Sequence, residues 1–459
     1  MTRLLEFNTR WSGSRALWRW SVAAFLGALM AYLLSMEHHG AATLPPQVGD
    51  GPDYDAIAFQ LWKGHGFSVD WDDPEFRAPY SPERADSPYR YLLTRHGTGP
   101  TTYRPPALPV LMAASYAAFG REFLPVRVLI AVSMALACAV IFWLVARRAG
   151  VLPGVLFFCL FVLADHRSKE YSCLILTEGP ACLAAALLAC ACIRCVDLRT
   201  AAWAVVAGLL GGVAVLVRSA FVVWLPALAG TIWLLTGQRS GTPSRKQKPR
   251  LVLCGVFLVA AALVQTPWAL RNCWLLQGFR PLGTQGDIGL GGAYNDTSFE
   301  RGGQWVPADQ TGLFAALKLE ALSTIAAENA AASHSRVAAL SWITQHPWKA
   351  IGLAFLRAHD LWRPRRPNDS LIFLCAVLGV MVYPARSECS VLVAAIAANT
   401  LGVAIAWGDA DRFLLPVAAP VCALAAVGLW SILHYGLKGP GRPLQPTGAA
   451  DRGPLPSCE

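Results

Sequence analysis

Charged residues are scarce in this sequence. They make up 15% of its 459 residues, while 55% are hydrophobic. Ordinary soluble domains carry about a quarter charged residues. The mean hydropathy is correspondingly high, at +0.42. This composition excludes an ordinary soluble domain and predicts a polytopic membrane protein.

Other signals are missing as well. No Gly-rich phosphate loop follows a predicted strand, which argues against a soluble enzyme that uses a nucleotide sugar. Most of the 13 cysteines lie inside apolar runs, where cysteine behaves as a small hydrophobic residue, so no disulfide framework is predicted. The net charge of +10 does not indicate nucleic-acid binding, because Lys and Arg fall in short clusters between apolar runs, as topology signals do.

What the sequence does contain is a series of apolar runs that, with their flanks, form ten candidate membrane spans. The basic clusters between them all fall on one side, which makes the topology self-consistent and places both termini in the cytoplasm. The first run is longer than the apolar part of a signal peptide and is expected to stay as a membrane helix. The runs are about 16–36, 124–146, 151–164, 174–194, 201–217, 219–236, 251–267, 371–384, 390–407 and 413–435.

The topology leaves two long loops, 37–123 and 268–370, on the external side of a single membrane domain, 1–436. The tail 437–459 is rich in Gly and Pro and is expected to be disordered in the cytoplasm. In the first loop, apolar residues recur at helical spacing from Tyr54 to Trp62, which predicts an amphipathic helix in the membrane interface. The apolar segment 104–120 is short and is expected to touch the membrane surface without crossing it.

Ionisable residues collect at the predicted external ends of the spans. Such positions are costly for charge and are candidates for function. Structural alternatives exist for each kind of residue: an acid can cap a helix or match its dipole, and an arginine can reach from a turn into the headgroup region. The residues are Asp50, Asp165, Glu178, Arg218, Arg271, Asp409, Asp411 and Arg412.

Arg218 is the hardest of these to explain structurally, because it interrupts a hairpin of two apolar helices. A guanidinium is permanently charged and its planar shape suits phosphate oxygens. An arginine at the external membrane face therefore suggests that a lipid phosphate binds there.

Several motifs in this order resemble the membrane glycosyltransferases of family 39. The similarity runs from about residue 16 to 435. The motifs are Asp50-x-x-x-Tyr54 with "AIAFQLWKGHGFS", then "YRPPALPVLMA", "LTEGPACLAAALL", "GLLGGVAVLVRSAFVVWLPAL", "TPWALRNCWLLQGFRPLGTQGD" and "RFLLPVAAP".

The resemblance implies an all-α integral membrane protein of the GT-C fold, with about ten transmembrane helices and external juxtamembrane helices in the first loop. It also implies an inverting enzyme of a bacterial inner membrane that takes a sugar from a polyprenyl-phosphate carrier. The acceptor would be a glycan, lipid or protein of the cell envelope, and membrane lipids but no nucleic acid would be partners.

The roles of individual residues follow from the same resemblance. Asp50 would be the catalytic base, and Glu178 would help to position the acceptor or the base. A phosphate leaving group departs as an anion, so it needs positive charge and no general acid. The residues expected to bind substrate are Tyr54, Arg104, Arg218, Arg271 and Arg412.

The sequence departs from the protein mannosyltransferases of the family, because Gly51 follows Asp50 where they have a paired Asp-Glu. This makes a protein acceptor less expected than a glycan or lipid. Of the extra carboxylates, Asp53 is expected to lie near Asp50 on the helix and Asp55 to face solvent.

Two alternatives stay open. His38, His39, His65 and His96 share the first loop, but their spacing matches no standard ligand pattern, so no metal site is predicted and a divalent metal is only possible. A transporter or flippase of a lipid-linked glycan would also place charges in the membrane. The spans here are apolar at mid-depth, which favours the enzyme.

Overall fold

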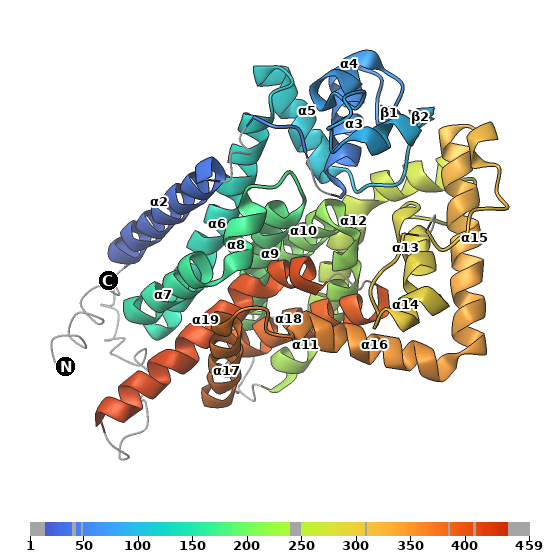
Figure 1. Ribbon diagram of the computed structural model, residues 1–459. Coiled ribbons are helices and arrows are strands. Elements are labelled where there is room, and N and C mark those ends of the chain that lie inside the picture. Colours follow the sequence, from blue (N-terminus) through green and yellow to red (C-terminus); the bar gives the residue numbers. More distant parts are fainter. Residues whose placement is uncertain are drawn as a thin grey trace, which may run out of the picture.

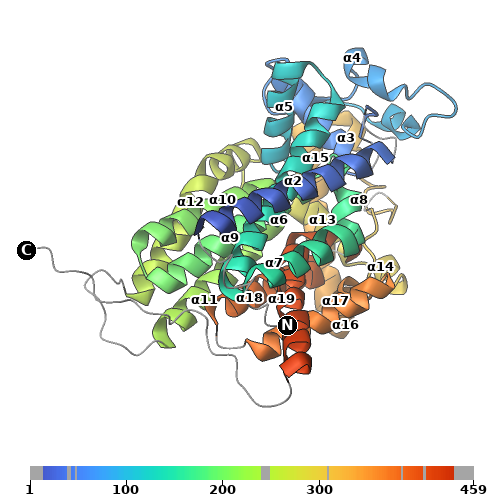
Figure 2. The same ribbon diagram turned by 90° about the vertical axis from the view of Figure 1, so that its left-hand side faces the viewer.

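The computed structural model describes residues 14–38, 43–46, 49–238, 249–307, 310–383, 386–406 and 410–438. Within them the chain is almost entirely helical, apart from one two-stranded hairpin. Figures 1 and 2 show the long helices packed side by side, with the segment between α3 and α5 at one end of this bundle. The predicted all-α membrane architecture is confirmed.

Each of the ten apolar runs contains a helix. Among the described residues, seven helices are long and apolar enough to cross a membrane, or eight if the bent pair 151–164 and 166–172 is one span. This count is lower than ten because two helices, α10 and α17, have only 17 and 16 residues. At 1.5 Å per residue they cover roughly 25 Å of a hydrocarbon core about 30 Å thick. The ten helices are α2 (Ser14–His38), α6 (Phe123–Ala149), α7 (Val151–Phe158) with the π-helical η3 (Cys159–Ala164), α9 (Glu178–Leu198), α10 (Ala201–Val217), η4 (Ser219–Val223) with α11 (Trp224–Gln238), α12 (Arg250–Leu275), α17 (Pro367–Val382), α18 (Ser387–Ala406) and α19 (Ala410–Lys438).

Small residues bring these helices close together. Gly208 and Gly212, four residues apart on α10, face α12, and a Cβ atom at either position would collide with α12. The glycines let the two backbones approach, as small residues at this spacing do in membrane helices. Helices α9 and α19 are the most buried of the candidate spans and lie at the centre of the main apolar core.

The region 43–123 forms a small compact unit at the end of the bundle (Figure 1). Its strands β1 (Ser68–Asp70) and β2 (Thr98–Pro100) pair antiparallel, with Val69 opposite Gly99. Helix α5 covers most of the segment 104–120 and, with 13 residues, is too short to cross a membrane alone. The remaining elements are α3 (Gly51–Trp62), α4 (Pro74–Arg77), η1 (Ala78–Tyr80), η2 (Arg90–Thr94) and α5 (Ala107–Phe119).

The expectation that α3 is an amphipathic helix with an exposed face in the membrane interface is wrong. Its residues from Gly51 to Gln60 are buried on all sides. One face, with Tyr54 and Ala58, packs on α5 and α6. Other residues around the helix, among them Ile57 and Phe59, pack with the aromatic residues of the α4, η1 and η2 region. The apolar spacing in the sequence includes Ile57 but does not indicate that Phe59 is buried as well.

Asp55 is also placed differently from the prediction. It is fully buried instead of facing solvent. The hydroxyls of Tyr80 and Tyr116 each donate to it at 2.7 Å, and Arg121 Nη2 lies 2.5 Å away. These partners come from η1, from α5 and from the turn after α5. They offset the cost of burying the charge of Asp55, which the helix pattern alone predicts to be exposed.

The region 268–370 is helical too. It includes the end of α12 and packs along one side of the bundle (Figure 1). Asp409 and the tail after Lys438 lie outside the described residues. The elements of this region are α13 (Gln285–Ala293), α14 (Asp296–Glu300), η5 (Leu319–Ala321), α15 (Thr324–Gln345) and α16 (Pro347–Trp362). Earlier in the chain, the short helix α8 (His166–Ser172) lies in the turn before α9.

Candidate active site

Arg412 joins the two carboxylates that the sequence singles out. Its Nη2 lies 2.7 Å from Asp50 Oδ2, and its Nε donates to Glu178 Oε1. Asp50 directly precedes α3 but makes no side-chain capping bond to it. Glu178 is the first residue of α9, and Arg412 is in the first turn of α19. The fold therefore brings the ends of three distant helices to one point.

Arg104 extends this contact toward α5. Its Nη2 lies 2.7 Å from Asp50 Oδ1, and its Nε donates to Asp53 Oδ2 at 2.9 Å. Arg95 from the end of η2 pairs with the other oxygen of Asp53. Asp53 is thus near Asp50, as predicted, but it is held by two arginines. The pairing of Asp53 with Arg95 could not be found from sequence spacing.

Arg218 completes the group on the other side. It follows the last residue of α10 in an extended conformation, and its Nη1 donates to Glu178 Oε1 at 3.1 Å. The guanidinium also lies over the ring of Phe413, 4.2 Å from its centroid. The second carboxylate oxygen of Glu178 is buried without a hydrogen-bond partner.

We refer to these residues as the first polar cluster. It holds three carboxylates and four guanidinium groups, so the described side chains carry one net positive charge. Such an excess in a mostly buried site favours binding of an anion. The members are Asp50, Asp53, Glu178, Arg95, Arg104, Arg218 and Arg412.

Asp50 is the most accessible carboxylate of the first polar cluster. Its side chain is 24% exposed, compared with 0% for Glu178 and 5% for Asp53. Burial by itself raises the pKa of Asp50, but the guanidinium groups of Arg104 and Arg412 outweigh burial and hold this pKa well below 3.8. In this arrangement Asp50 is ionised and is a weak base.

Tyr54 lies next to the cluster without joining its ion pairs. Its ring is 5.5 Å from the Arg104 guanidinium. Burial, followed by the charge of Asp50, raises the pKa of its hydroxyl to about 12, so the phenol stays neutral. Tyr54 therefore supports Arg104 through its ring.

Arg271 is not brought to the first polar cluster. Its guanidinium donates to the carbonyl oxygens of Thr101 at 3.1 Å and Phe67 at 2.8 Å. It also lies over the rings of Phe67 and Trp268. These contacts hold strands β1 and β2 against the end of α12. Arg271, which was predicted to bind substrate, therefore joins two parts of the fold instead.

A mainly apolar pocket lies beside Arg218, between η4, α11, α18 and α19. It is small and partly open to its surroundings. Arg218 and Asn399 are its polar residues. The apolar lining consists of Ala220, Phe221, Trp224, Gly402, Val403, Phe413 and Pro416.

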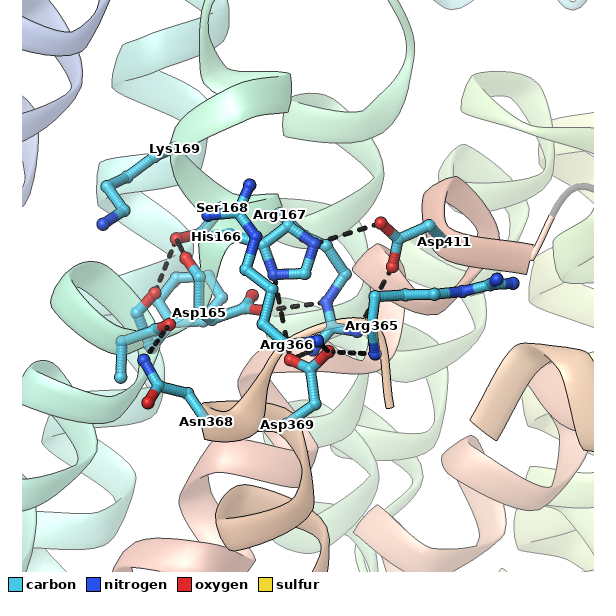
Figure 3. A network of polar contacts seen from close by, with 12 residues as sticks. Asp165, His166, Arg167, Ser168, Lys169, Arg365, Arg366, Asn368, Asp369 and Asp411 are labelled. Atoms are coloured by element: carbon cyan, nitrogen blue, oxygen red, sulfur yellow. Dashed lines mark hydrogen bonds and ion pairs between the residues drawn. The ribbon is translucent and has the colours of Figure 1, made fainter. Parts of the chain in front are cut away.

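A second polar cluster lies beside the first and is largely missed by the sequence reasoning, which noted only Asp165 and Asp411. Figure 3 shows it around the start of α8. We define it by its five ionisable residues, Asp165, His166, Arg167, Asp369 and Asp411. The "DHR" directly after an apolar run is its signal in the sequence, but nothing there indicates that Asp369 joins it.

The histidines of the first loop do not form such a group in the described part of the chain. His65 Nδ1 contacts Gln60 at 2.7 Å and His96 Nδ1 contacts Asp72 at 2.8 Å. His39 and the side chain of His38 lie outside the described residues.

Comparisons with known proteins agree with this fold. Residues 103–268, just over a third of the chain, match the family model described as dolichyl-phosphate-mannose-protein mannosyltransferase. No curated protein sequence matches the chain. Among solved structures, an oligosaccharyltransferase from Archaeoglobus fulgidus in the apo form has 16% identity and a TM-score of 0.50 over 93% of this chain.

This chain spans only 53% of that oligosaccharyltransferase. Two structures of ArnT from Cupriavidus metallidurans are also similar. The structure bound to undecaprenyl phosphate has 15% identity and a TM-score of 0.37 over 91% of this chain and 80% of that one. The apo structure has 14% identity and a TM-score of 0.34 over 91% of this chain and 79% of that one. The resemblance seen in the sequence motifs is confirmed: the chain is a multi-pass membrane protein with the fold of the GT-C glycosyltransferases.

Proposed function

We propose that this protein transfers a sugar from a polyprenyl-phosphate carrier to a glycan, lipid or protein acceptor at the external face of a bacterial inner membrane. The observation that carries the proposal is the contact of Arg412 with both Asp50 and Glu178. It places a reachable carboxylate, a buried carboxylate and several guanidinium groups at one site. The family model matched by residues 103–268 is described by a polyprenyl-phosphate sugar, which supports this donor class.

The donor phosphate is proposed to bind at Arg218 and Arg412. Arg218 lines a small, mainly apolar pocket, and a guanidinium beside apolar side chains suits a charged headgroup on an apolar chain. The single excess positive charge of the first polar cluster matches one phosphodiester anion. When the sugar leaves, negative charge grows on the phosphate, and fixed guanidinium groups stabilise it without reorganisation.

Asp50 is proposed to take the proton from the acceptor. Its low pKa in the ligand-free arrangement is a consequence of its pairing with Arg104 and Arg412. A bound phosphate competes for Arg412, and the loss of that partner raises the basicity of Asp50. Donor binding would thereby turn a weak base into a stronger one before the acceptor reacts.

Glu178 is proposed to act as a positioning residue. It is fully buried, and one oxygen accepts from both Arg218 and Arg412. A negative charge between two guanidinium groups reduces their mutual repulsion and fixes their spacing. The spacing of the two arginines would then match the oxygens of one phosphate.

The position of the charges favours an enzyme over the transporter alternative. Glu178 begins α9, Arg218 follows α10, and Arg412 lies in the first turn of α19. A translocation path would require polar groups along the middle of several spans. The first polar cluster lies at helix ends instead.

The activity can be tested with protein purified in detergent and a panel of radiolabelled polyprenyl-phosphate hexoses and pentoses as donors. Asp50→Asn is expected to lower the transfer rate by about 10²- to 10⁴-fold, the range of a general base. Asp72→Asn, at an exposed carboxylate away from the first polar cluster, is the matched control. Transfer that is unchanged in Asp50→Asn would refute the assignment of the base.

Sidedness needs its own experiment. Glu83 is exposed in the 43–123 unit. A Glu83→Cys variant should react with a membrane-impermeant maleimide in intact cells above the background of the parent chain. Labelling only after lysis would place the site in the cytoplasm.

Mass analysis of envelope glycans from cells lacking the protein would identify the sugar and acceptor.

A further inference from the structure

The second polar cluster is built from three separate parts of the chain. Asp165 stands in the bend between η3 and α8, and His166 and Arg167 begin α8. Asp369 is in the first turn of α17, and Asp411 is in the first turn of α19. Figure 3 shows their side chains directed toward one another. None of these residues contributes to the first polar cluster.

The acids of this cluster outnumber its fixed cations. Arg167 contacts all three, with Nε 2.7 Å from Asp165 Oδ1, Nη2 3.0 Å from Asp369 Oδ1 and Nη1 3.4 Å from Asp411 Oδ1. With a neutral imidazole, three carboxylates and one guanidinium leave a net charge of minus two. Asp165 and Asp369 are 0% exposed and His166 is 6% exposed. Burying such a charge is costly unless a cation offsets it.

Two ligand-type atoms at the centre of the cluster lack a hydrogen-bond partner. Asp165 Oδ2 and His166 Nδ1 are both buried and unpartnered. His166 Nδ1 lies 3.8 Å from Asp369 Oδ1, too far for a hydrogen bond. One ligand atom each from Asp165, His166 and Asp369 lies within 4.8 Å of the others. Metal bonds of about 2.0–2.2 Å would bring such atoms roughly 3.3 Å apart, so only a small closure is needed.

The outer contacts match those that support metal ligands. In the tautomer protonated at Nε2, His166 donates to Asp411 Oδ2 at 3.0 Å, which leaves the Nδ1 lone pair free. Metal-binding histidines usually donate their other ring N–H to a carboxylate in this way. Asp369 Oδ2 accepts from the backbone N–H groups of Arg365 and Arg366, at 2.9 and 3.0 Å. Asp369 is therefore oriented through its Oδ2, and Asp165 is oriented through its Oδ1, which accepts from Arg167 Nε.

We propose that the second polar cluster binds one divalent transition-metal cation through Asp165 Oδ2, His166 Nδ1 and Asp369 Oδ1. The imidazole nitrogen favours Zn²⁺, Mn²⁺, Fe²⁺ or Co²⁺ over Mg²⁺ and Ca²⁺, which prefer oxygen ligands alone. The charge of the cation would bring the net charge of the cluster to zero.

The site would act on the first polar cluster only through the backbone. Asp411 precedes Arg412, and Asp411 is tied to His166 and Arg167. A cation that fixes His166 therefore also fixes the first turn of α19, on which Arg412 stands. This is a structural role and does not depend on the reaction proposed above.

Co²⁺ added to the full chain, purified in detergent with metal-free buffers, is the direct test. We expect one Co²⁺ per chain with a visible d–d absorption band and no near-ultraviolet thiolate band, because the site has no sulfur ligand. His166→Gln should weaken Co²⁺ binding at least about a hundredfold, since loss of an outer contact alone costs 10- to 100-fold. Bound Co²⁺ should also raise the thermal unfolding midpoint of the parent chain but not of His166→Gln.

Two variants serve as controls. Asp165→Asn removes a ligand without touching the helix cap that Asp369 provides, so it should behave like His166→Gln even if an Asp369 variant fails to fold. His96→Gln alters an exposed His–Asp pair of similar geometry and should leave binding unchanged. Absence of saturable Co²⁺ binding, or binding that both ligand variants retain, would overturn the proposal and leave the cluster as an ion-pair network.

Discussion

The guanidinium of Arg412 lies 2.7 Å from the carboxylate of Asp50, although 362 positions separate the two residues in the sequence. The same guanidinium bonds Glu178. Both acids thus share one guanidinium at the start of α19. Any ligand that takes Arg412 changes the charge balance at both.

Arg412→Lys tests this shared role. A lysine keeps the charge but offers a single ammonium where the guanidinium reaches two carboxylates. We expect the transfer rate to fall by about tenfold or more while the protein stays folded. Arg84→Lys, at an exposed ion pair, should leave the rate unchanged. Equal rates for Arg412→Lys and the parent would show that the double contact has no role.

Arg218→Ala should mainly weaken donor binding. The proposed phosphate contact exists in the ground state as well as in the transition state, so its loss raises the KM for the donor more than it lowers kcat. We expect KM to rise by about tenfold or more, as for loss of a charge-assisted hydrogen bond. Steady-state kinetics over a range of donor concentrations measures this. A drop in kcat alone would contradict a binding role.

The pH dependence of the reaction follows from the lowered pKa of Asp50. The pKa of Asp50 in the folded protein lies below its ordinary value of 3.8. The ion pairs of Asp50 therefore stabilise the fold fully above pH 3.8, and this stabilisation is lost as the pH falls through the pKa of the folded state. The acid limb of kcat/KM, which reports the free enzyme, should therefore lie below about pH 4.

The acid limb of kcat should lie at a higher pH than that of kcat/KM, because bound phosphate takes Arg412 from Asp50. Arg104→Gln removes another positive partner and should move both limbs upward. Rate profiles at limiting and saturating donor give both values. Identical limbs for the two parameters would argue against competition between phosphate and Asp50 for the guanidinium.

Asp55→Asn should destabilise the 43–123 unit. Removing one partner of a buried ion pair leaves Arg121 uncompensated and costs about 3 kcal/mol or more. Asp86→Asn breaks an exposed pair with Arg84 and should leave the unfolding midpoint nearly unchanged, because exposed ion pairs contribute little to stability. Thermal unfolding followed by tryptophan fluorescence compares them. A midpoint for Asp55→Asn equal to that of Asp86→Asn would contradict the structural role of the buried pair.

Much of the fold could be predicted from local sequence. Each apolar run forms a helix, because long apolar segments in a membrane must satisfy their backbone hydrogen bonds internally. The start of α3 after Asp50 and its end near Gly64 were also visible, and Gly64 has a φ of 84°. Of the seven predicted site residues, Asp50, Glu178, Arg104, Arg218 and Arg412 meet, Tyr54 lies beside them, and Arg271 lies apart.

The sequence by itself determined which segments are helical and which polar residues end them, since both depend on neighbours within a few turns. Only the tertiary structure decided the partners. Asp55 is buried because Tyr80, Tyr116 and Arg121 come from other elements to meet it. His166 meets Asp369 because α8 and α17 both pack against α19. Such contacts join residues far apart in the chain, and local periodicity carries no information about them.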